Sequence, residues 1–241
     1  MRQTDLEKQL SELAERLRTS FGERLSAVVL YGSAAMGDWQ ERHSDLNILC
    51  VLDRITPTEL ATSEPIFRWW REGGNPPPLL LTGEEVRTST DCFAMEFHDM
   101  QEHRRVLHGR DIIEDLQIDR CFYRAQVEHE LRAKQIRLRQ KSAEVLSDGK
   151  RLLRLLTDSI STFCVLGRHA LILSGHAPRW KKPEILAALA GAMNTPLNGA
   201  NEILTIRAAG KSVPDSAAVQ LLDQYLVELD ALVRFVDNIT K

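Results

Sequence analysis

Apolar and polar residues follow two different periods along the chain, and the change from one to the other divides it into two parts. In the first part, short apolar runs end in polar turns, which is typical of buried strands. These runs cover residues 25–31, 46–52 and 79–81. Residues 4–21 instead carry apolar side chains three or four positions apart, which predicts a helix that covers a sheet with one face.

Beyond about residue 115, the apolar residues follow a helical period throughout. The expected helices cover residues 119–145, 150–174, 184–192, 200–209 and 215–239. We therefore predict an α+β fold, with a mixed β-sheet domain at residues 1–115 and an all-α helical bundle domain at residues 116–241.

A further strand is predicted at residues 91–98, where the sequence DCFAMEFH alternates. Its aromatic side chains share one face of such a strand, and Glu96 projects from the other. A carboxylate in the middle of a sheet needs a partner. Glu96 is therefore either a site residue or one half of an ion pair at a sheet edge, with Arg104 or Arg105 as the other half.

The first apolar run stops at Gly32 and Ser33, and a short helical start is expected directly after them. Glycine allows the backbone to approach a ligand closely, and the N–H groups at a helix start attract anions. The Ser33 hydroxyl adds one more donor for a phosphate oxygen. The alternative is that Gly32 ends a strand and Ser33 caps a helix without any ligand.

Two polar residues, Asp45 and Asn47, stand at the start of the next apolar run. They are two positions apart, so they project from the same face of a strand. Oxygen ligands of this kind suit Mg²⁺, and Asp45 is the stronger candidate because an amide brings no negative charge. The alternatives are that Asp45 bonds to the turn before the strand and that Asn47 is a satisfied buried amide.

Taken together, Gly32-Ser33 and the segment SDLNI at residues 44–48 resemble the signature of the nucleotidyltransferase superfamily related to DNA polymerase β. The resemblance is greatest to the small bacterial branch that is similar to aminoglycoside nucleotidyltransferases. It implies a nucleotidyltransferase-like sheet domain followed by a helical domain. The chain departs from the family at one position, because the family has Asp where this chain has Asn47.

The resemblance also implies roles for single residues. Gly32 and Ser33 would hold nucleotide phosphates, and Asp45, Asn47 and Glu96 would hold Mg²⁺. Glu96 is similar to the third acidic residue of the family, which acts as a general base or a metal ligand. As a base it would take the proton of the acceptor hydroxyl.

One candidate lies in the second part of the chain. In relatives, a lysine in a loop at the place of Lys182 approaches the nucleotide or the acceptor. Lys182 is therefore a further nucleotide-binding candidate, and the alternative is a basic loop at the surface.

Composition narrows the choice of partners. The net charge of −3 argues against general binding to nucleic acid, which needs a basic surface. No apolar run approaches the ~20 residues of a membrane-spanning helix. The four cysteines are widely spaced and form no CxxC pair, which indicates reduced thiols in a cytoplasmic protein. Association into a homo-oligomer is left open.

Two hypotheses on function follow. The first is an Mg²⁺-dependent bacterial enzyme that transfers a nucleoside monophosphate from an NTP, with ATP favoured, to a hydroxyl of a small acceptor. The second, suggested by Asn47, is a catalytically degenerate module of the same fold that binds a nucleotide or a protein partner.

Overall fold

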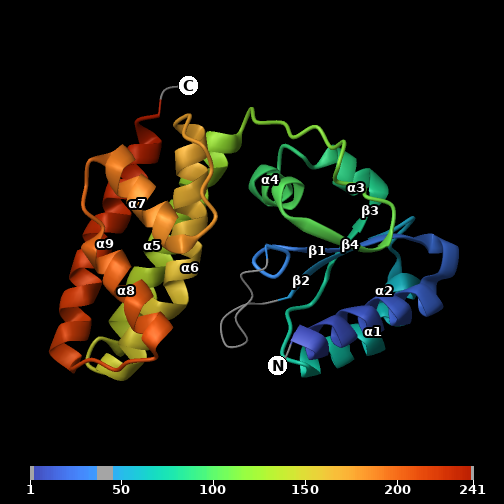
Figure 1. Cartoon of the computed structure of the whole chain (residues 1–241), viewed down its shortest axis with the longest axis horizontal. Helices are drawn as coiled ribbons and strands as arrows, with labels where there is room; N and C mark the ends of the chain where they lie inside the picture. Colours follow the sequence, from blue (N-terminus) through green and yellow to red (C-terminus); the bar gives the residue numbers. More distant parts are fainter. Residues whose placement is uncertain (1–2, 37–45, 240–241) are drawn as a thin grey trace. The chain divides into compact units, whose positions relative to one another are not determined.

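The computed structural model describes residues 3–36 and 46–239 of the 241-residue chain (Figure 1). The chain divides into two compact units, an α/β unit at residues 1–120 and a helical unit at residues 121–241. None of the helices in the described ranges is both long and apolar enough to cross a lipid bilayer.

The α/β unit is built on a mixed four-stranded sheet with the order β3-β2-β1-β4. The strands are β1 (Leu25–Tyr31), β2 (Asn47–Leu52), β3 (Leu79–Thr82) and β4 (Arg104–Gly109). β1 pairs antiparallel with both β2 and β4, whereas β2 pairs parallel with β3. The strands predicted in the first part of the chain are thereby confirmed, apart from the one at residues 91–98.

Helices cover both faces of this sheet, as Figure 1 shows. They are α1 (Gln3–Phe21), α2 (Pro57–Glu72), α3 (Gly83–Thr88) and α4 (Ala94–Glu102), and the 3-10 helix η1 (Gly22–Arg24) joins α1 to β1. α1 and α2 pack on the face that carries Val28 and Ile48. α3 and α4 pack on the opposite face, which carries Val29 and Leu49. Alternation along β1 and β2 thus assigns each side chain to one of two hydrophobic clusters.

The strand predicted at residues 91–98 is wrong, because most of this segment belongs to α4. The sequence alternates, but its apolar residues also recur at helical spacing, and Phe97 and Met100 are buried three positions apart. The Phe93 N–H already donates to the Ser89 carbonyl at 3.0 Å, so the chain turns before an extended strand can begin. Pairing in the sheet starts again only at β4.

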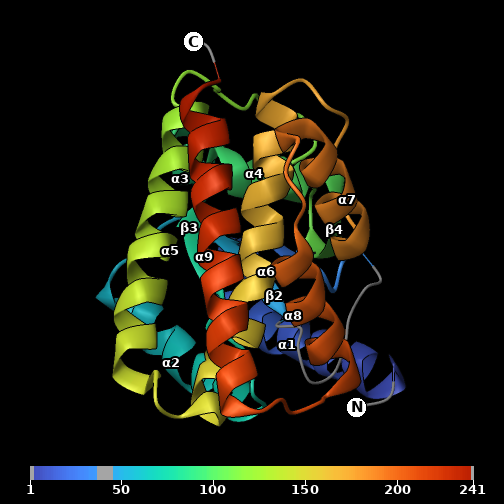
Figure 2. The same ribbon diagram turned by 90° about the vertical axis from the view of Figure 1, so that its left-hand side faces the viewer.

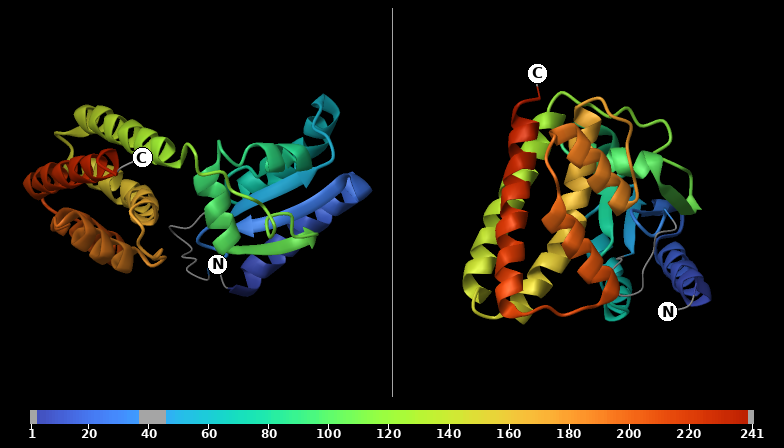
Figure 3. Two further views of the ribbon diagram at one scale, coloured as in Figure 1. Left: turned by 90° about the horizontal axis from the view of Figure 1, so that it is seen from above. Right: turned by 60° about the vertical axis from the view of Figure 1, so that its left-hand side comes forward.

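The helical unit is a bundle around α6 (Gly149–Leu173). The other helices are α5 (Tyr123–Val145), α7 (Lys182–Met193), α8 (Asn198–Ala209) and α9 (Asp215–Asp237). α6 packs against each of these four, and α5, α6 and α9 run side by side along most of their length (Figures 2 and 3). The predicted all-α part is therefore confirmed as helical.

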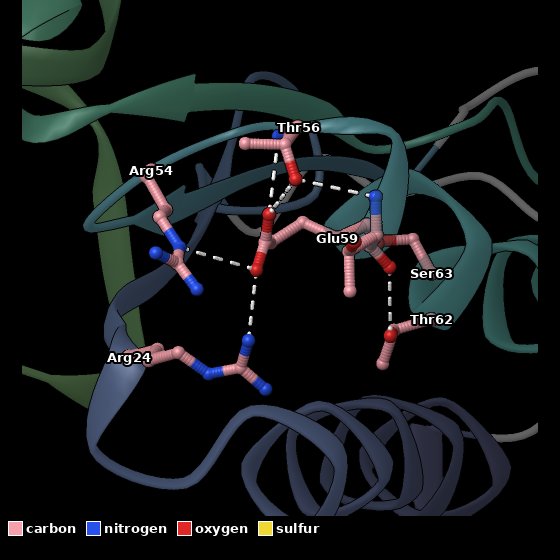
Figure 4. Close-up of polar contacts among 7 residues, drawn as sticks. Arg24, Arg54, Thr56, Glu59, Thr62 and Ser63 are labelled. Carbon is pink, nitrogen blue, oxygen red and sulfur yellow. Dashed lines mark hydrogen bonds and ion pairs between the residues drawn. The ribbon is translucent and has the colours of Figure 1, made fainter.

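The end of the sheet where β1 begins and β2 ends is held by a buried carboxylate (Figure 4). Glu59, in the first turn of α2, has a side chain that is only 1% exposed. Its carboxylate accepts a hydrogen bond from Arg24 Nη1 at 2.8 Å and lies 3.5 Å from Arg54 Nε. It also accepts from the hydroxyl and the N–H of Thr56, which completes a capping box at the start of α2. The hydrogen bond from the Thr56 hydroxyl and the charge of Arg54 lower the pKa of Glu59.

A second polar pair lies at the same end. The Ser26 hydroxyl donates to Asp53 Oδ1 at 3.0 Å, and the Asp53 N–H donates to the Arg24 carbonyl at 3.1 Å. We call this region, defined by Arg24, Ser26, Asp53 and Glu59, the closed end of the sheet, because its polar groups bind one another.

Candidate functional site

The opposite end of the sheet, where β1 stops and β2 starts, is formed by a tight turn. Gly32 follows β1 with a φ of +78°, a conformation that side chains disfavour. Its carbonyl accepts hydrogen bonds from the N–H groups of Ala35 at 3.0 Å and Met36 at 3.3 Å. The expected helical start is therefore a hydrogen-bonded turn in the described range up to Met36.

Asn47 lies directly beside this turn. It is the first residue of β2 and pairs with Tyr31, the last residue of β1. A Cβ placed on Gly32 would lie 2.9 Å from Asn47 Nδ2, so the amide occupies the space that a side chain at Gly32 would need. The amide oxygen Oδ1 lies more than 4 Å from that Cβ, so it points away from Gly32.

Neither the Ser33 hydroxyl nor the Asn47 amide has a hydrogen-bond partner within the described part of the chain. Both side chains are half-buried. We call the region of Tyr31, Gly32, Ser33 and Asn47 the open end of the sheet. The residues that the structure describes form no hydrogen bond with the side chains of Ser33 and Asn47, which makes this end the candidate site.

Glu96 reaches this end from α4 and not from a strand. α4 packs through Phe97 on the sheet face that carries Leu49, and Tyr31 packs against the same cluster. Burial raises the pKa of Tyr31, and the negative charge of Glu96 raises it further. The carboxylate of Glu96 therefore acts on the open end from an exposed position in the first turn of α4.

The proposed ion pair of Glu96 with Arg104 or Arg105 is not formed. Arg104 Nε instead donates to both carboxylate oxygens of Asp111 at 2.9 and 2.8 Å. Arg105 Nη1 donates to Glu7 on α1 at 2.7 Å. Both arginines thus pair with carboxylates other than Glu96.

Arg104 also positions the helix that carries Glu96, a function that sequence reasoning missed. Its Nη1 donates to the carbonyl of Gln101 at 2.6 Å, in the last turn of α4. The Gln101 side chain in turn donates to the carbonyl of Leu116 at 2.6 Å. Arg104, Asp111 and Gln101 therefore tie the end of α4 to β4 and to the segment that follows it. The sequence suggested Arg104 only as a partner of Glu96, and it gave no signal for Asp111 or Gln101.

Two other residues were predicted for the site, Asp45 and Lys182. Asp45 falls outside the described residues. Lys182 begins α7 in the helical unit, where it is half-buried. Burial raises the pKa of the Cys164 thiol to about 12, and the positive charge of Lys182 acts against this rise.

The donor set of the open end suits a hard cation. Mg²⁺ prefers oxygen ligands and is usually held by one or two carboxylates together with substrate phosphates. Among the described residues, the amide oxygen of Asn47 and the carboxylate of Glu96 are the candidate ligands. Both are oxygen donors. The set carries little negative charge, because Asn47 is neutral.

Comparison with known proteins adds one likeness. No family model matches the chain, and no curated protein matches its sequence. Among solved structures, spectinomycin adenyltransferase AAD(9) from Enterococcus faecialis, solved with ATP and spectinomycin, is similar with a TM-score of 0.61. The similarity covers 96% of this chain and 99% of that one, at 14% sequence identity. This likeness shows that the chain shares the fold of that adenyltransferase, with an α/β unit followed by helices, which is the architecture that the resemblance implied.

Proposed function

We propose that this protein is a nucleotidyltransferase that transfers a nucleoside monophosphate from an NTP to a hydroxyl of a small acceptor. ATP is the favoured donor, and Mg²⁺ is the metal. The observation that carries this proposal is the open end of the sheet, where the Gly32 turn and the charge of Glu96 occur together with two polar side chains that bond to no described residue.

The Gly32 turn is proposed to bind the phosphates of the NTP. The positive φ of Gly32 keeps this turn tight. The Ser33 hydroxyl has no acceptor within the described chain and is free to donate to a phosphate oxygen. Lys182, from the helical unit, is proposed as a further phosphate ligand because a lysine binds phosphate as a point charge.

Asn47, Glu96 and Asp45 are proposed to hold Mg²⁺. A bound Mg²⁺ neutralises charge on the phosphates of the substrate. Since Asn47 contributes no charge, we expect metal binding to depend mostly on the two carboxylates and on the NTP itself. Binding of metal and nucleotide should therefore be strongly interdependent.

Glu96 is proposed as the general base. Its carboxylate accepts the proton of the acceptor hydroxyl while the hydroxyl oxygen forms a bond to the α-phosphorus. The bond from the α-phosphorus to pyrophosphate breaks in the same reaction. The carboxylate is exposed in the first turn of α4, where an acceptor hydroxyl can reach it.

A small hydroxylated acceptor is supported by the likeness to the adenyltransferase whose structure contains ATP and spectinomycin. That likeness is of fold, so the proposal extends only to the class of acceptor. The test is to incubate the full chain with Mg²⁺, each of the four NTPs and a panel of small polyhydroxylated compounds, and to measure pyrophosphate release. Calorimetric titration with the same NTPs gives binding separately, and a chain that binds no NTP with or without Mg²⁺ is not a nucleotidyltransferase.

A second candidate, a catalytically degenerate module of the same fold, is favoured by one observation. Asn47 stands at a metal-ligand position of the family, and its amide is packed against Gly32. Asn47→Asp distinguishes the two functions, with Asn194→Asp at the end of α7 as the matched control for an Asn-to-Asp change. An active wild type that gains about tenfold or less in Mg²⁺ affinity supports the enzyme, whereas pyrophosphate release by Asn47→Asp alone supports the degenerate module.

A further inference from the structure

The helical unit contains a pocket that the proposed reaction does not use. It has a volume of about 180 Å³ and opens between α5 and α6. Its floor is formed by five buried side chains, which are Leu138 from α5, Phe163 and Leu166 from α6, and Tyr225 and Leu229 from α9. An apolar cavity of about 150 Å³ can hold a benzene molecule, so this pocket has room for a small ring system.

The rim of the pocket is basic on one side. Lys134, Arg137 and Lys141 lie along one face of α5, three and four positions apart, and all three are exposed. Within the described chain, no carboxylate lies at ion-pair distance from Arg137 or Lys141, whereas Lys134 lies 3.4 Å from Glu130. Two cations at the mouth of an apolar pocket are thus left for a ligand.

The other side of the rim carries one acidic residue and two hydroxyls. Asp158 on α6 lies 3.9 Å from Arg154, so its charge is partly offset on the solvent side. Ser159 and Thr162 also line the pocket. The lining therefore has three positive charges and one negative charge, which favours an anion.

Tyr225 gives the apolar floor a polar edge. The Ser159 hydroxyl donates to the Tyr225 oxygen at 3.3 Å, and the ring of Tyr225 lies 5.4 Å from that of Phe163 at an angle of 50°. Burial raises the pKa of Tyr225, which keeps the phenol neutral. Two tilted rings, one of which carries a neutral hydroxyl, suit a flat apolar body better than a strongly hydrated one.

We propose that this pocket binds a small organic acid with a flat apolar body, such as an aromatic carboxylate. The ring lies against Phe163 and Tyr225, and the carboxylate lies at the mouth, where Arg137 and Lys141 bind it. Arginine suits this position because its planar guanidinium can donate two parallel hydrogen bonds to a carboxylate. The site lies wholly within the helical unit and does not depend on the proposed transfer reaction.

The test is calorimetric titration of the full chain with 1-naphthoate, and with the neutral 1-naphthalenemethanol for comparison. We expect 1-naphthoate to bind with a Kd of about 0.1 mM, as a ligand of this size can reach with ~0.4 kcal/mol per non-hydrogen atom. We expect the alcohol to bind about tenfold more weakly or worse, because it lacks the charge that pairs with the rim. No binding of 1-naphthoate at about 5 mM, or equal binding of acid and alcohol, would overturn the proposal.

Two variants assign the binding to this pocket. Arg137→Glu reverses a charge at the mouth of the pocket and should raise the Kd of 1-naphthoate by about tenfold or more. Arg139→Glu makes the same change on the same helix outside the lining and should leave the affinity within about twofold. An equal loss in both variants would show a general charge effect and overturn the site.

A third variant fills the pocket. Thr162→Phe should abolish binding while the thermal unfolding midpoint shows that the bundle is still folded. If Thr162→Phe unfolds the chain, Leu155→Phe at the edge of the lining provides the same test. Displacement of 1-naphthoate by ATP at lower concentrations than by benzoate would overturn the proposal, because it would assign the pocket to a nucleotide.

Discussion

The two ends of the sheet use similar residues in opposite ways. At the closed end, the carboxylate of Glu59 binds Arg24 and Thr56, and the hydroxyl of Ser26 binds Asp53. At the open end, a serine hydroxyl and an asparagine amide have no partner within the described ranges. Sheet ends are rich in polar groups, so the presence of polar side chains does not itself mark a site.

The difference shows which polar groups belong to the fold. A polar group that is removed from water without a hydrogen bond destabilises the protein by about 1–3 kcal/mol, so pairing is the default at a structural position. Within the described ranges, the half-buried side chains of Ser33 and Asn47 form no hydrogen bond and so do not gain this stability. This contrast supports the proposal that the open end binds a ligand, and it predicts that mutations will separate stability from function according to the end that they change.

The largest expected effect is on catalysis and comes from Glu96→Gln at the open end. Removing the proposed base should lower the rate of pyrophosphate release by about 10²–10⁴-fold, the usual contribution of general base catalysis. The side chain is exposed, so the thermal unfolding midpoint should not change. Glu102→Gln, an exposed residue of the same helix, is the matched control, and an equal loss of rate in both variants would contradict the assignment.

The next effect comes from Gly32→Ala, which tests the packing of the open end. The new Cβ would stand 2.9 Å from Asn47 Nδ2 and would also adopt a φ of +78°. We expect a loss of about 1–3 kcal/mol in the free energy of unfolding and a loss of NTP binding. Chemical denaturation and calorimetric titration measure the two effects.

Gly74→Ala is the control for this change, because Gly74 has a φ of +86° and no atom within 4 Å of the added Cβ. Its free energy of unfolding should fall by about 1–2 kcal/mol, the strain of a positive φ alone, and NTP binding should be kept. The double variant Gly32→Ala/Asn47→Ala should recover the part of the loss that comes from crowding. If the double variant is no more stable than Gly32→Ala, the Asn47 amide does not fill the space beside Gly32.

A change at the closed end should affect stability and its dependence on pH. The pKa of Glu59 is below the ordinary value of 4.5 in the folded chain. Its carboxylate therefore stabilises the fold above about pH 4.5, and this contribution is lost as the pH falls through the lowered pKa. Glu59→Gln can keep a capping box but not the charge, so it should be less stable than wild type at pH 7.

The two stability curves should converge in acid, where wild-type Glu59 is protonated. Thermal unfolding from pH 7 to pH 3 measures this convergence, and Glu64→Gln, an exposed residue of the same helix, is the control. NTP binding at pH 7 should be unchanged as long as the chain is folded. A loss of NTP binding in folded Glu59→Gln would mean that the two ends are coupled and would break the comparison.

The sequence predicted strands where length and composition agreed. β1 is a seven-residue apolar run with β-branched residues that ends at a glycine, and these features favour a strand over a helix. Residues 91–98 satisfy both periods, and burial of Phe97 and Met100 against the sheet decided for the helix. The strand prediction was wrong, yet α4 covers the sheet face on which Tyr31 packs, so the helix also brings Glu96 towards the open end.

The hydrogen-bond partners of side chains were less predictable than the helices and strands. Arg24 and Glu59 are 35 positions apart in sequence, and their pairing depends on how η1 and α2 pack, which no local pattern contains. The same holds for Arg104, which binds Asp111 and not Glu96. Gly32 and Asn47 lie close together because Tyr31, which precedes Gly32, pairs with Asn47 in the sheet, but their role in a site stays a prediction. Asp45, outside the described residues, stays a prediction.

The smallest expected effects come from removing one hydroxyl at each end, and they give the sharpest form of the comparison. Ser26→Ala at the closed end removes a donor to Asp53 and should lower the free energy of unfolding by about 0.5–1.5 kcal/mol. NTP binding should not change. Ser33→Ala at the open end breaks no hydrogen bond within the described chain, so stability should stay within about 0.5 kcal/mol of wild type.

Ser33→Ala should instead weaken NTP binding by about tenfold, because a hydrogen bond to a charged phosphate contributes about 1.5–3 kcal/mol. Denaturant unfolding and calorimetric titration of the same two proteins give both quantities. We expect Ser26→Ala to lower stability without changing NTP affinity, and Ser33→Ala to lower NTP affinity without changing stability. If Ser33→Ala loses stability and keeps its affinity for NTP, the open end is a structural feature like the closed one, and the hydroxyl has a partner in the fold.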